Sequence, residues 1–113
     1  MSRHDDKTSL KDMLSHAREA VELLGKTGRE ELERDRVMQL ALTRLVEIVG
    51  EADNRVSLEI RQKTPEIPWP QIVGMRNRLI HGYDVIDCDL LWDTVTNDLP
   101  PLITALKTVI EEM

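Results

Sequence analysis

Hydrophobic positions recur every three or four residues along most of the chain, which is the spacing of one face of an α-helix. Residues 10–24 hold such a stripe; Thr8 or Ser9 is expected to cap its start, and Gly25 is a stop signal. A second stripe over about residues 30–55 predicts the longest helix, with acidic side chains near its N-terminal end, where the helix dipole favours them.

Prolines interrupt the pattern between residues 57 and 70, since proline cannot sit inside a continuous helix. We expect a loop there, with a short helical turn at 57–63. The next helix is expected to open at Trp69-Pro70, because proline is tolerated in a first turn, and to end at Gly82, a natural C-terminal cap.

The last stripe covers residues 88–113 and is interrupted at Pro100-Pro101, which predicts a kinked helix or two helices end to end. No segment shows the alternation typical of a strand, and there is no internal repeat. The sequence therefore predicts an all-α fold: one domain over residues 1–113, an up-and-down helical bundle of four to five helices, with the last helix kinked at Pro100-Pro101.

Composition narrows the class of protein further. The chain has 113 residues, the size of one domain, and it has no Phe, so an aliphatic core is expected. No apolar run approaches the roughly 20 residues that span a bilayer, and the first residues are not followed by the apolar segment of a signal peptide.

The single cysteine, Cys88, cannot form an internal disulfide; it fits the last apolar stripe and is expected in the core. We expect a cytoplasmic location and no metal site, because no His, Cys or carboxylate pair has ligand spacing on a shared face.

Charge is unevenly spread along the chain. The formal net charge is −6, with net −3 over residues 1–54, +3 over residues 55–81 and −6 over residues 82–113. An acidic protein does not attract nucleic acid diffusely, although a local basic cleft can hold phosphate. Charge counting alone favours the simpler alternative, a solvated mix of surface charges.

Residues 76–83, Arg-Asn-Arg-Leu-Ile-His-Gly-Tyr, are the most informative stretch. On a helix, Arg76 falls at the centre of the apolar stripe, where a leucine is usual, and Arg78 points towards solvent. Asn77 and His81 are four residues apart and therefore adjacent on one flank.

A guanidinium on an apolar face has three possible explanations. Arg76 pairs with a carboxylate on a facing helix, or it lies at a subunit interface, or it lines a cleft that receives an anion. Position alone favours the ion pair.

His81 and Tyr83 each have a structural and a functional interpretation. His81 is either a C-terminal helix residue stabilised by the dipole or a proton-transfer group near neutral pH. Tyr83 is either a half-buried ring with its hydroxyl at the surface or a hydroxyl positioned beside the histidine. Each structural interpretation is the stronger one alone, but Arg, Asn, His and Tyr converge in the only basic part of the chain, which favours function.

The spacing Arg76-x4-His81-x-Tyr83 matches the RX4HXY motif of HepT-like proteins, a branch of the HEPN family of helical ribonucleases. Residues 47–52 and 69–77, and Leu91-Trp92 followed by Asp98-Leu99-Pro100, also resemble segments of that family, so the resemblance covers roughly residues 10–110, essentially the whole chain.

The resemblance implies a homodimer in which the motif helices of two subunits meet at a cleft. It also implies a metal-independent endoribonuclease without a cofactor, acting as the toxin of a type II/VII-like toxin–antitoxin system. The expected partners are RNA and a minimal nucleotidyltransferase antitoxin that transfers AMP from ATP onto Tyr83.

Roles for the motif residues follow from RNA chemistry. RNA supplies its own nucleophile, the 2′-hydroxyl, so His81 would move protons and Arg76 would hold the phosphate. Asn77 would orient the imidazole or the phosphate, and Arg78 would contact the RNA backbone or the antitoxin. The alternative is a non-catalytic helical partner that binds a nucleotidyltransferase or nucleotides and presents Tyr83 for modification without cutting RNA.

Overall fold

The computed structural model describes residues 5–81 and 85–113, and only the backbone at positions 52, 53, 76, 80 and 81. Its helices are α1 (Asp6–Leu24), α2 (Arg29–Arg34), α3 (Arg36–Gly50), α4 (Leu58–Lys63), α5 (Trp69–Leu79), α6 (Cys88–Asp93) and α7 (Leu99–Glu112). The chain also forms a 3-10 helix η1 (Glu51–Asn54), a π-helical segment η2 (Thr94–Asp98) and the two-residue strands β1 (Ile80–His81) and β2 (Val85–Ile86).

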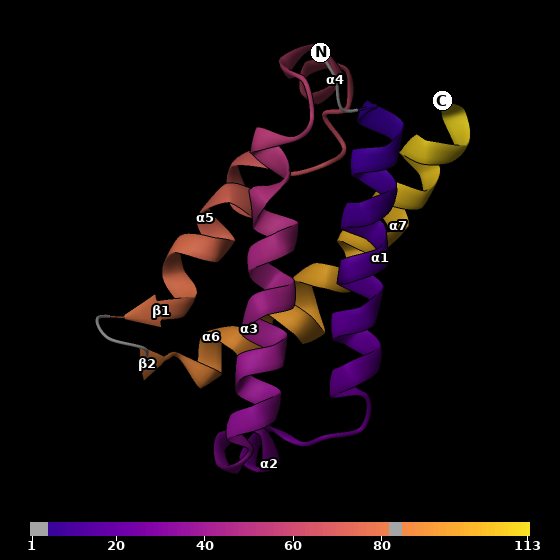
Figure 1. The fold of residues 1–113 in the computed structure, drawn as a ribbon. Helices are drawn as coiled ribbons and strands as arrows, with labels where there is room; N and C mark the ends of the chain where they lie inside the picture. Colours follow the sequence, from indigo (N-terminus) through magenta and orange to yellow (C-terminus); the bar gives the residue numbers. More distant parts are fainter. Residues whose placement is uncertain (1–4, 82–84) are drawn as a thin grey trace.

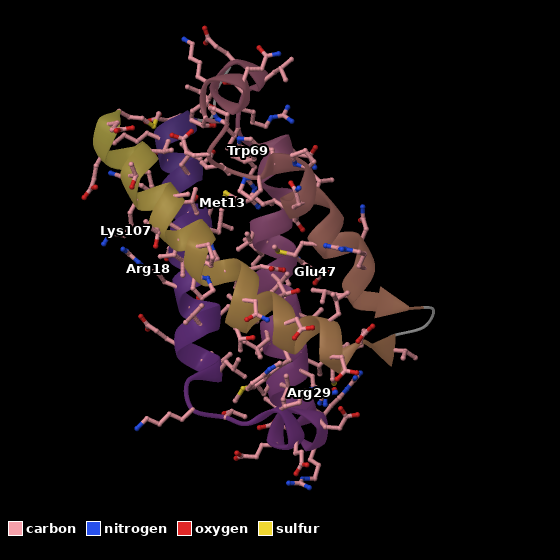
Figure 2. The ribbon with its side chains drawn as sticks, turned by 180° about the vertical axis from the view of Figure 1, so that it is seen from behind. Met13, Arg18, Arg29, Glu47, Trp69 and Lys107 are labelled. Carbon is pink, nitrogen blue, oxygen red and sulfur yellow. The ribbon has the colours of Figure 1, made fainter. Side chains whose placement is uncertain are left out.

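The long helices pack as a bundle in which α3 lies between α1 and α5 (Figure 1). Helix α7 packs along α1. Helix α6, which precedes α7 in the chain, contacts α3 and α5, and the view from behind shows the path from α6 into α7 (Figure 2). The predicted all-α helical bundle is confirmed. The described part also contains a minimal antiparallel β1–β2 pair, which the sequence pattern does not reveal.

Helix α1 begins earlier than its apolar stripe. Asp5 caps it through a side-chain oxygen that accepts a backbone N–H bond at 3.0 Å, so the expected caps Thr8 and Ser9 lie inside the helix, and that expectation is wrong. The helix ends as predicted at Gly25, whose φ of +50° is a conformation that side chains with a Cβ adopt at a cost.

The single helix expected over residues 30–55 is divided in two at Asp35. The Asp35 carboxylate accepts a bond from the backbone N–H of Met38 at 3.0 Å and so caps α3. The buried amide of Gln39 donates to two carbonyls at the end of α2, at 2.8 and 3.0 Å. These side chains replace the hydrogen bonds that a continuous helix would have made.

The interruption near Pro100-Pro101 is confirmed, and it lies before the prolines. Pro100 and Pro101 stand in the first turn of α7 and have no N–H to donate to carbonyls one turn earlier. The preceding segment is π-helical: the N–H of Leu99 bonds the carbonyl of Thr94, five residues back. Helices α6 and α7 therefore follow one another through a widened turn.

The core is aliphatic, as predicted. Trp69 is its one aromatic member among the described side chains, and the most deeply buried large ones are Leu10, Leu32, Leu42, Ile67, Ile72, Leu79, Leu91, Leu99 and Leu106. Within the described residues, no helix combines the length and the apolar character needed to cross a membrane.

Candidate active site

Helix α5, which carries the first part of the motif, is anchored at its start by a buried hydrogen-bond chain. The indole N–H of Trp69 donates to the Thr64 hydroxyl at 3.0 Å, and that hydroxyl donates to the carbonyl of Ile60 in α4 at 2.8 Å. Pro70 occupies the first turn, where no N–H is required. The predicted helical turn at 57–63 and the predicted start at Trp69-Pro70 are both confirmed.

The buried face of α5 is offset from position 76. The described side chains of α5 that are buried are Trp69, Ile72, Met75 and Leu79. At about 100° per residue, the centre of this face lies roughly 50° of rotation from position 76. The central position expected for Arg76 on the apolar stripe stays a prediction, since half-buried Val73 extends the apolar face on the other side of position 76. The Arg76 side chain lies outside the described part, so the three explanations of its role stay predictions.

Helix α5 ends at Leu79, not at the predicted Gly82. The carbonyl of Leu79 accepts a bond from the backbone N–H of Asp87 at 2.9 Å, and His81 pairs with Val85 in the β1–β2 ladder. Because His81 belongs to a strand, the prediction that it neighbours Asn77 on one helix flank is wrong.

The remaining predicted site residues divide between the described and the undescribed parts. Asn77 and Arg78 are exposed on α5, and the outward direction predicted for Arg78 is confirmed. The Arg78 Nε–H donates to the carbonyl of Gly74 at 3.2 Å, which holds the guanidinium along its own helix. The side chain of His81 and the whole of Tyr83 lie outside the described residues.

The segment after β2 is fixed by side chains at the start of α6. Asp87 caps α6 by accepting a bond from the Leu90 N–H at 3.0 Å. Asp89 pairs with Arg29 at the start of α2, with 2.8 Å between the Arg29 Nε and the carboxylate, and Arg29 also bonds Glu33 at 2.6 Å. Hydrogen bonds to these two carboxylates raise the pKa of Arg29, because they stabilise its charged form.

Cys88, also at the start of α6, is half-buried and does not belong to the core, so its predicted core position is wrong. Partial burial raises the pKa of its thiol, and the Glu33 carboxylate adds to this effect while the Arg29 guanidinium opposes it. A thiol that resists ionisation is a poor nucleophile, which argues against a catalytic role.

A pocket of about 440 Å³ lies beside the motif helix, between α5 and the η2–α7 junction. Ile72, Met75 and Leu102 form its buried floor, and Arg78 and Asp98 stand among the exposed side chains around it. Helix α5 contributes Gln71, Ile72, Met75 and Arg78 to this pocket.

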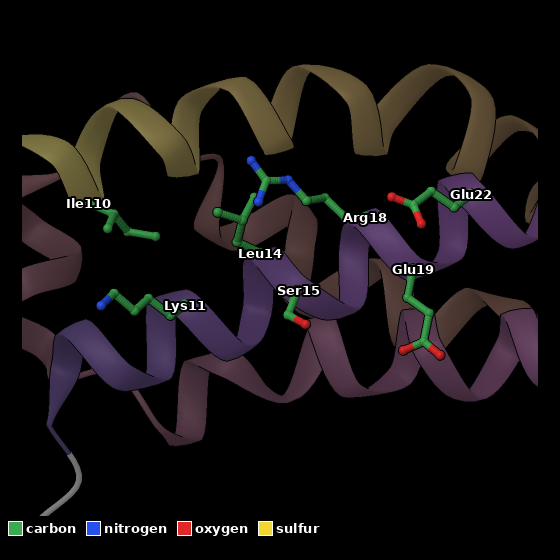
Figure 3. A pocket seen from close by; sticks show the side chains of 7 residues that line it. All are labelled: Lys11, Leu14, Ser15, Arg18, Glu19, Glu22 and Ile110. Carbon is green, nitrogen blue, oxygen red and sulfur yellow. The ribbon is translucent and has the colours of Figure 1, made fainter.

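A larger groove, of about 570 Å³, lies elsewhere on the molecule, between α1 and α7 (Figure 3). Its lining consists of Lys11, Leu14, Ser15, Arg18, Glu19, Glu22 and Ile110, so it contains no residue of the motif. Its cations, Lys11 and Arg18, precede its carboxylates, Glu19 and Glu22, along α1, and the structure does not connect the groove to the candidate site.

The match to a family model identifies the family of this chain. A model described as "Ribonuclease HepT-like" matches residues 13–109. The chain belongs to the HepT-like ribonuclease family. The match contains α5, both strands and all of the predicted site residues.

Individual relatives named as RNases are similar to this chain over most of its length. A Methanocaldococcus jannaschii protein, named as a candidate RNase, is 37% identical over 102 residues, which cover 90% of this chain and 94% of the relative. A Thermococcus cleftensis protein named "Probable ribonuclease HepT" is 39% identical over 100 residues, covering 85% and 91%. No solved structure gives a significant match.

The sequence pattern missed the polar side chains that share the pocket with Arg78. Gln71, Asn97 and Asp98 stand at its rim, and two of them come from η2, about 20 residues after Arg78. The Asp98-Leu99-Pro100 run is visible in the sequence, but its approach to α5 depends on the tertiary packing of the HepT-like bundle.

Proposed function

We propose that this chain is a metal-independent endoribonuclease and the toxin of a type II/VII-like toxin–antitoxin system. The observation that carries the proposal is the complete RX4HXY spacing, from Arg76 to Tyr83, in a chain that belongs to the HepT-like ribonuclease family. The names of its relatives, which describe RNases, support the same reaction class.

The reaction needs few groups from the protein. A base removes the proton of the RNA 2′-hydroxyl, whose oxygen attacks the adjacent phosphorus. The bond from phosphorus to the 5′-oxygen breaks, and an acid protonates that oxygen. The products are a 2′,3′-cyclic phosphate and a 5′-hydroxyl, so no metal or external nucleophile is required. His81 moves the protons, and Arg76 stabilises the charge that develops on the phosphate.

A homodimer completes this proposal. One subunit has one motif histidine, whereas the reaction needs two proton transfers. A symmetric dimer whose motif helices meet at a shared cleft supplies two imidazoles and two guanidinium groups. Asn77 then orients the phosphate, because the end of α5 at Leu79 separates it from a helical pairing with His81.

Regulation by a nucleotidyltransferase antitoxin completes the system. Transfer of AMP from ATP onto the Tyr83 hydroxyl, with release of pyrophosphate, would fill the cleft with a phosphate and a base and so exclude RNA. Arg78, exposed on α5, contacts the RNA backbone or the antitoxin. RNA and ATP are both available in the cytoplasm, where we place the protein.

Expression of the chain alone tests the toxin activity. The expected result is arrested growth with cleaved RNA, and recovery of growth with His81→Ala or Arg76→Ala. His16→Ala, a histidine on α1 outside the motif, is the matched control and should stay toxic. A harmless wild-type chain that cuts no RNA would leave the non-catalytic partner as the better account, and toxic alanine variants would refute the site assignment.

Intact mass tests the regulation. Co-production with a nucleotidyltransferase from a neighbouring reading frame should add whole AMP units to the chain. The sequence has one tyrosine, so Tyr83→Phe should abolish every addition. An unmodified wild-type chain, or additions that survive in Tyr83→Phe, would contradict modification of this residue.

A further inference from the structure

The pocket between α5 and the η2–α7 junction has the volume and the lining of a subsite for one small flat ligand. Its volume of about 440 Å³ exceeds what a single nucleobase needs, and its floor is apolar, with Ile72 and Leu102 buried and Met75 beside them. Proline and methionine side chains offer flat or adaptable apolar contact, and Pro101 stands at the rim. An apolar floor with a few polar groups at the edge is the usual composition of a small-ligand site.

The polar groups at the rim are available for a ligand. Gln71, Asn97 and Asp98 are exposed and have no hydrogen-bond or ion-pair partner for their side chains within the described residues. Arg78 uses its Nε–H on the Gly74 carbonyl, which leaves its two terminal nitrogens unpaired in the same part of the chain. Arg78 and Asp98 line one pocket without forming an ion pair with each other.

The backbone that presents two of these groups is unusual. Asn97 and Asp98 end the π-helical segment η2, and the wider π turn changes the direction in which the following side chains project. Single π turns inside helices occur frequently at functional sites. The Asp98 side chain does not cap α7, although it stands at the position where an aspartate commonly does so.

We infer that this pocket binds a guanine base of the RNA strand, beside the cleavage motif, with Asp98 and Arg78 as the residues that determine specificity. This inference rests on the proposed ribonuclease function, and it replaces the RNA-backbone contact proposed there for Arg78 with a contact to the base. Guanine presents two adjacent donors, N1–H and the N2 amino group, to which a carboxylate can bond. It also presents two acceptors, O6 and N7, that suit the terminal nitrogens of an arginine.

The other bases fit this pair of side chains less well. Adenine and cytosine place an acceptor next to their single amino donor on the pairing edge, where it would face the Asp98 carboxylate. Uracil offers one donor between two acceptors. Unstacked RNA bases are commonly read by stacking together with hydrogen bonds to these edges. The amides of Gln71 and Asn97 can donate or accept and are suited to the sugar or the remaining base edge.

Nucleotide binding by the whole chain tests the subsite without any need for cleavage. In a backbone amide NMR titration, GMP should shift the signals of Met75, Asn97 and Leu102 at roughly ten-fold lower concentration than AMP, CMP or UMP. Asp98→Asn, an exposed change that keeps the volume, should abolish this preference. Asp93→Asn, an exposed carboxylate at the end of α6 outside the pocket, should retain it.

Cleavage of RNA strands that contain one guanine separates the two proposals. Cuts at a fixed distance from the guanine, lost with Asp98→Asn, support the subsite. Cleavage without dependence on guanine would overturn the subsite and leave the ribonuclease proposal intact. GMP-selective shifts with no cleavage would support the subsite and contradict the ribonuclease proposal. Equal binding of the four nucleotides, or shifts confined to other regions, would overturn the subsite.

Discussion

Two buried threonines of this protein have opposite hydrogen-bonding states. The Thr64 hydroxyl accepts a bond from the Trp69 indole at the start of the motif helix and donates to a carbonyl. The Thr43 hydroxyl, buried on α3, has no partner within the described residues. A buried polar group is favourable only when it is paired, so the same chemical change should have opposite signs at the two positions.

Thr64→Val should lower the free energy of unfolding by about 1–3 kcal/mol, because the indole N–H is left buried without an acceptor. Thr43→Val, which removes only an unpaired hydroxyl, should leave stability unchanged or raise it by up to about 1 kcal/mol. Urea denaturation measures both, and exposed Thr104→Val serves as the surface control. Equal losses at both positions would contradict this difference.

The half-buried thiol of Cys88 gives a pH prediction. Burial raises its pKa by disfavouring the thiolate, so alkylation by iodoacetamide at pH 8 should be slower than for an exposed cysteine and should continue to accelerate above pH 9. Arg29→Ala removes the nearby cation that opposes the shift, so it should slow alkylation further. Faster alkylation in that variant would contradict the assigned charges.

At the scale of elements, the division of the chain at Asp35 is the main departure from the sequence pattern. In a continuous helix Asp35→Ala would be neutral or stabilising, because alanine is the better helix former. Since Asp35 caps α3, the substitution should instead lower the free energy of unfolding by about 1 kcal/mol. Asp12→Ala, an exposed position inside α1, is the matched control and should cost nothing.

The element boundaries that the sequence predicted correctly are those set by single residues. The stop at Gly25 and the start at Trp69-Pro70 depend on backbone properties of single residues, and both were predictable. The break at Asp35 was not, because the apolar stripe continues across it and the replacement bonds come from a buried Gln39. The end of α5 at Leu79 was also missed, since it depends on the pairing of β1 with Val85 and Ile86 in β2.

The candidate site likewise contains residues that the sequence reveals and residues that only the tertiary packing brings in. The motif residues Arg76, Asn77, Arg78, His81 and Tyr83 are contiguous, so their spacing is visible in the sequence. Asn97 and Asp98 share a pocket with Arg78 only because η2 packs near α5, and no local sequence pattern indicates a π turn. The centre of the buried face of α5 likewise depends on which helices pack against it, and sequence periodicity gave it only approximately.

At the scale of the whole molecule, the proposal requires two subunits to act on one phosphate. A dimer of one wild-type and one His81→Ala subunit, purified through two different tags, should keep far less than half of the wild-type cleavage rate. The reason is that both imidazoles serve a shared cleft. Retention of half the rate would indicate independent sites, and a wild-type/His16→Ala dimer should keep the full rate.

Cleavage of a defined single-stranded RNA by the purified chain in the presence of EDTA tests the central claim most directly. The account predicts products with a 2′,3′-cyclic phosphate and a 5′-hydroxyl, with rate losses of about 10²–10⁴-fold for His81→Ala and about 10²–10³-fold for Arg76→Ala. Intact RNA, or alanine variants that cut as fast as the wild-type chain, would contradict it.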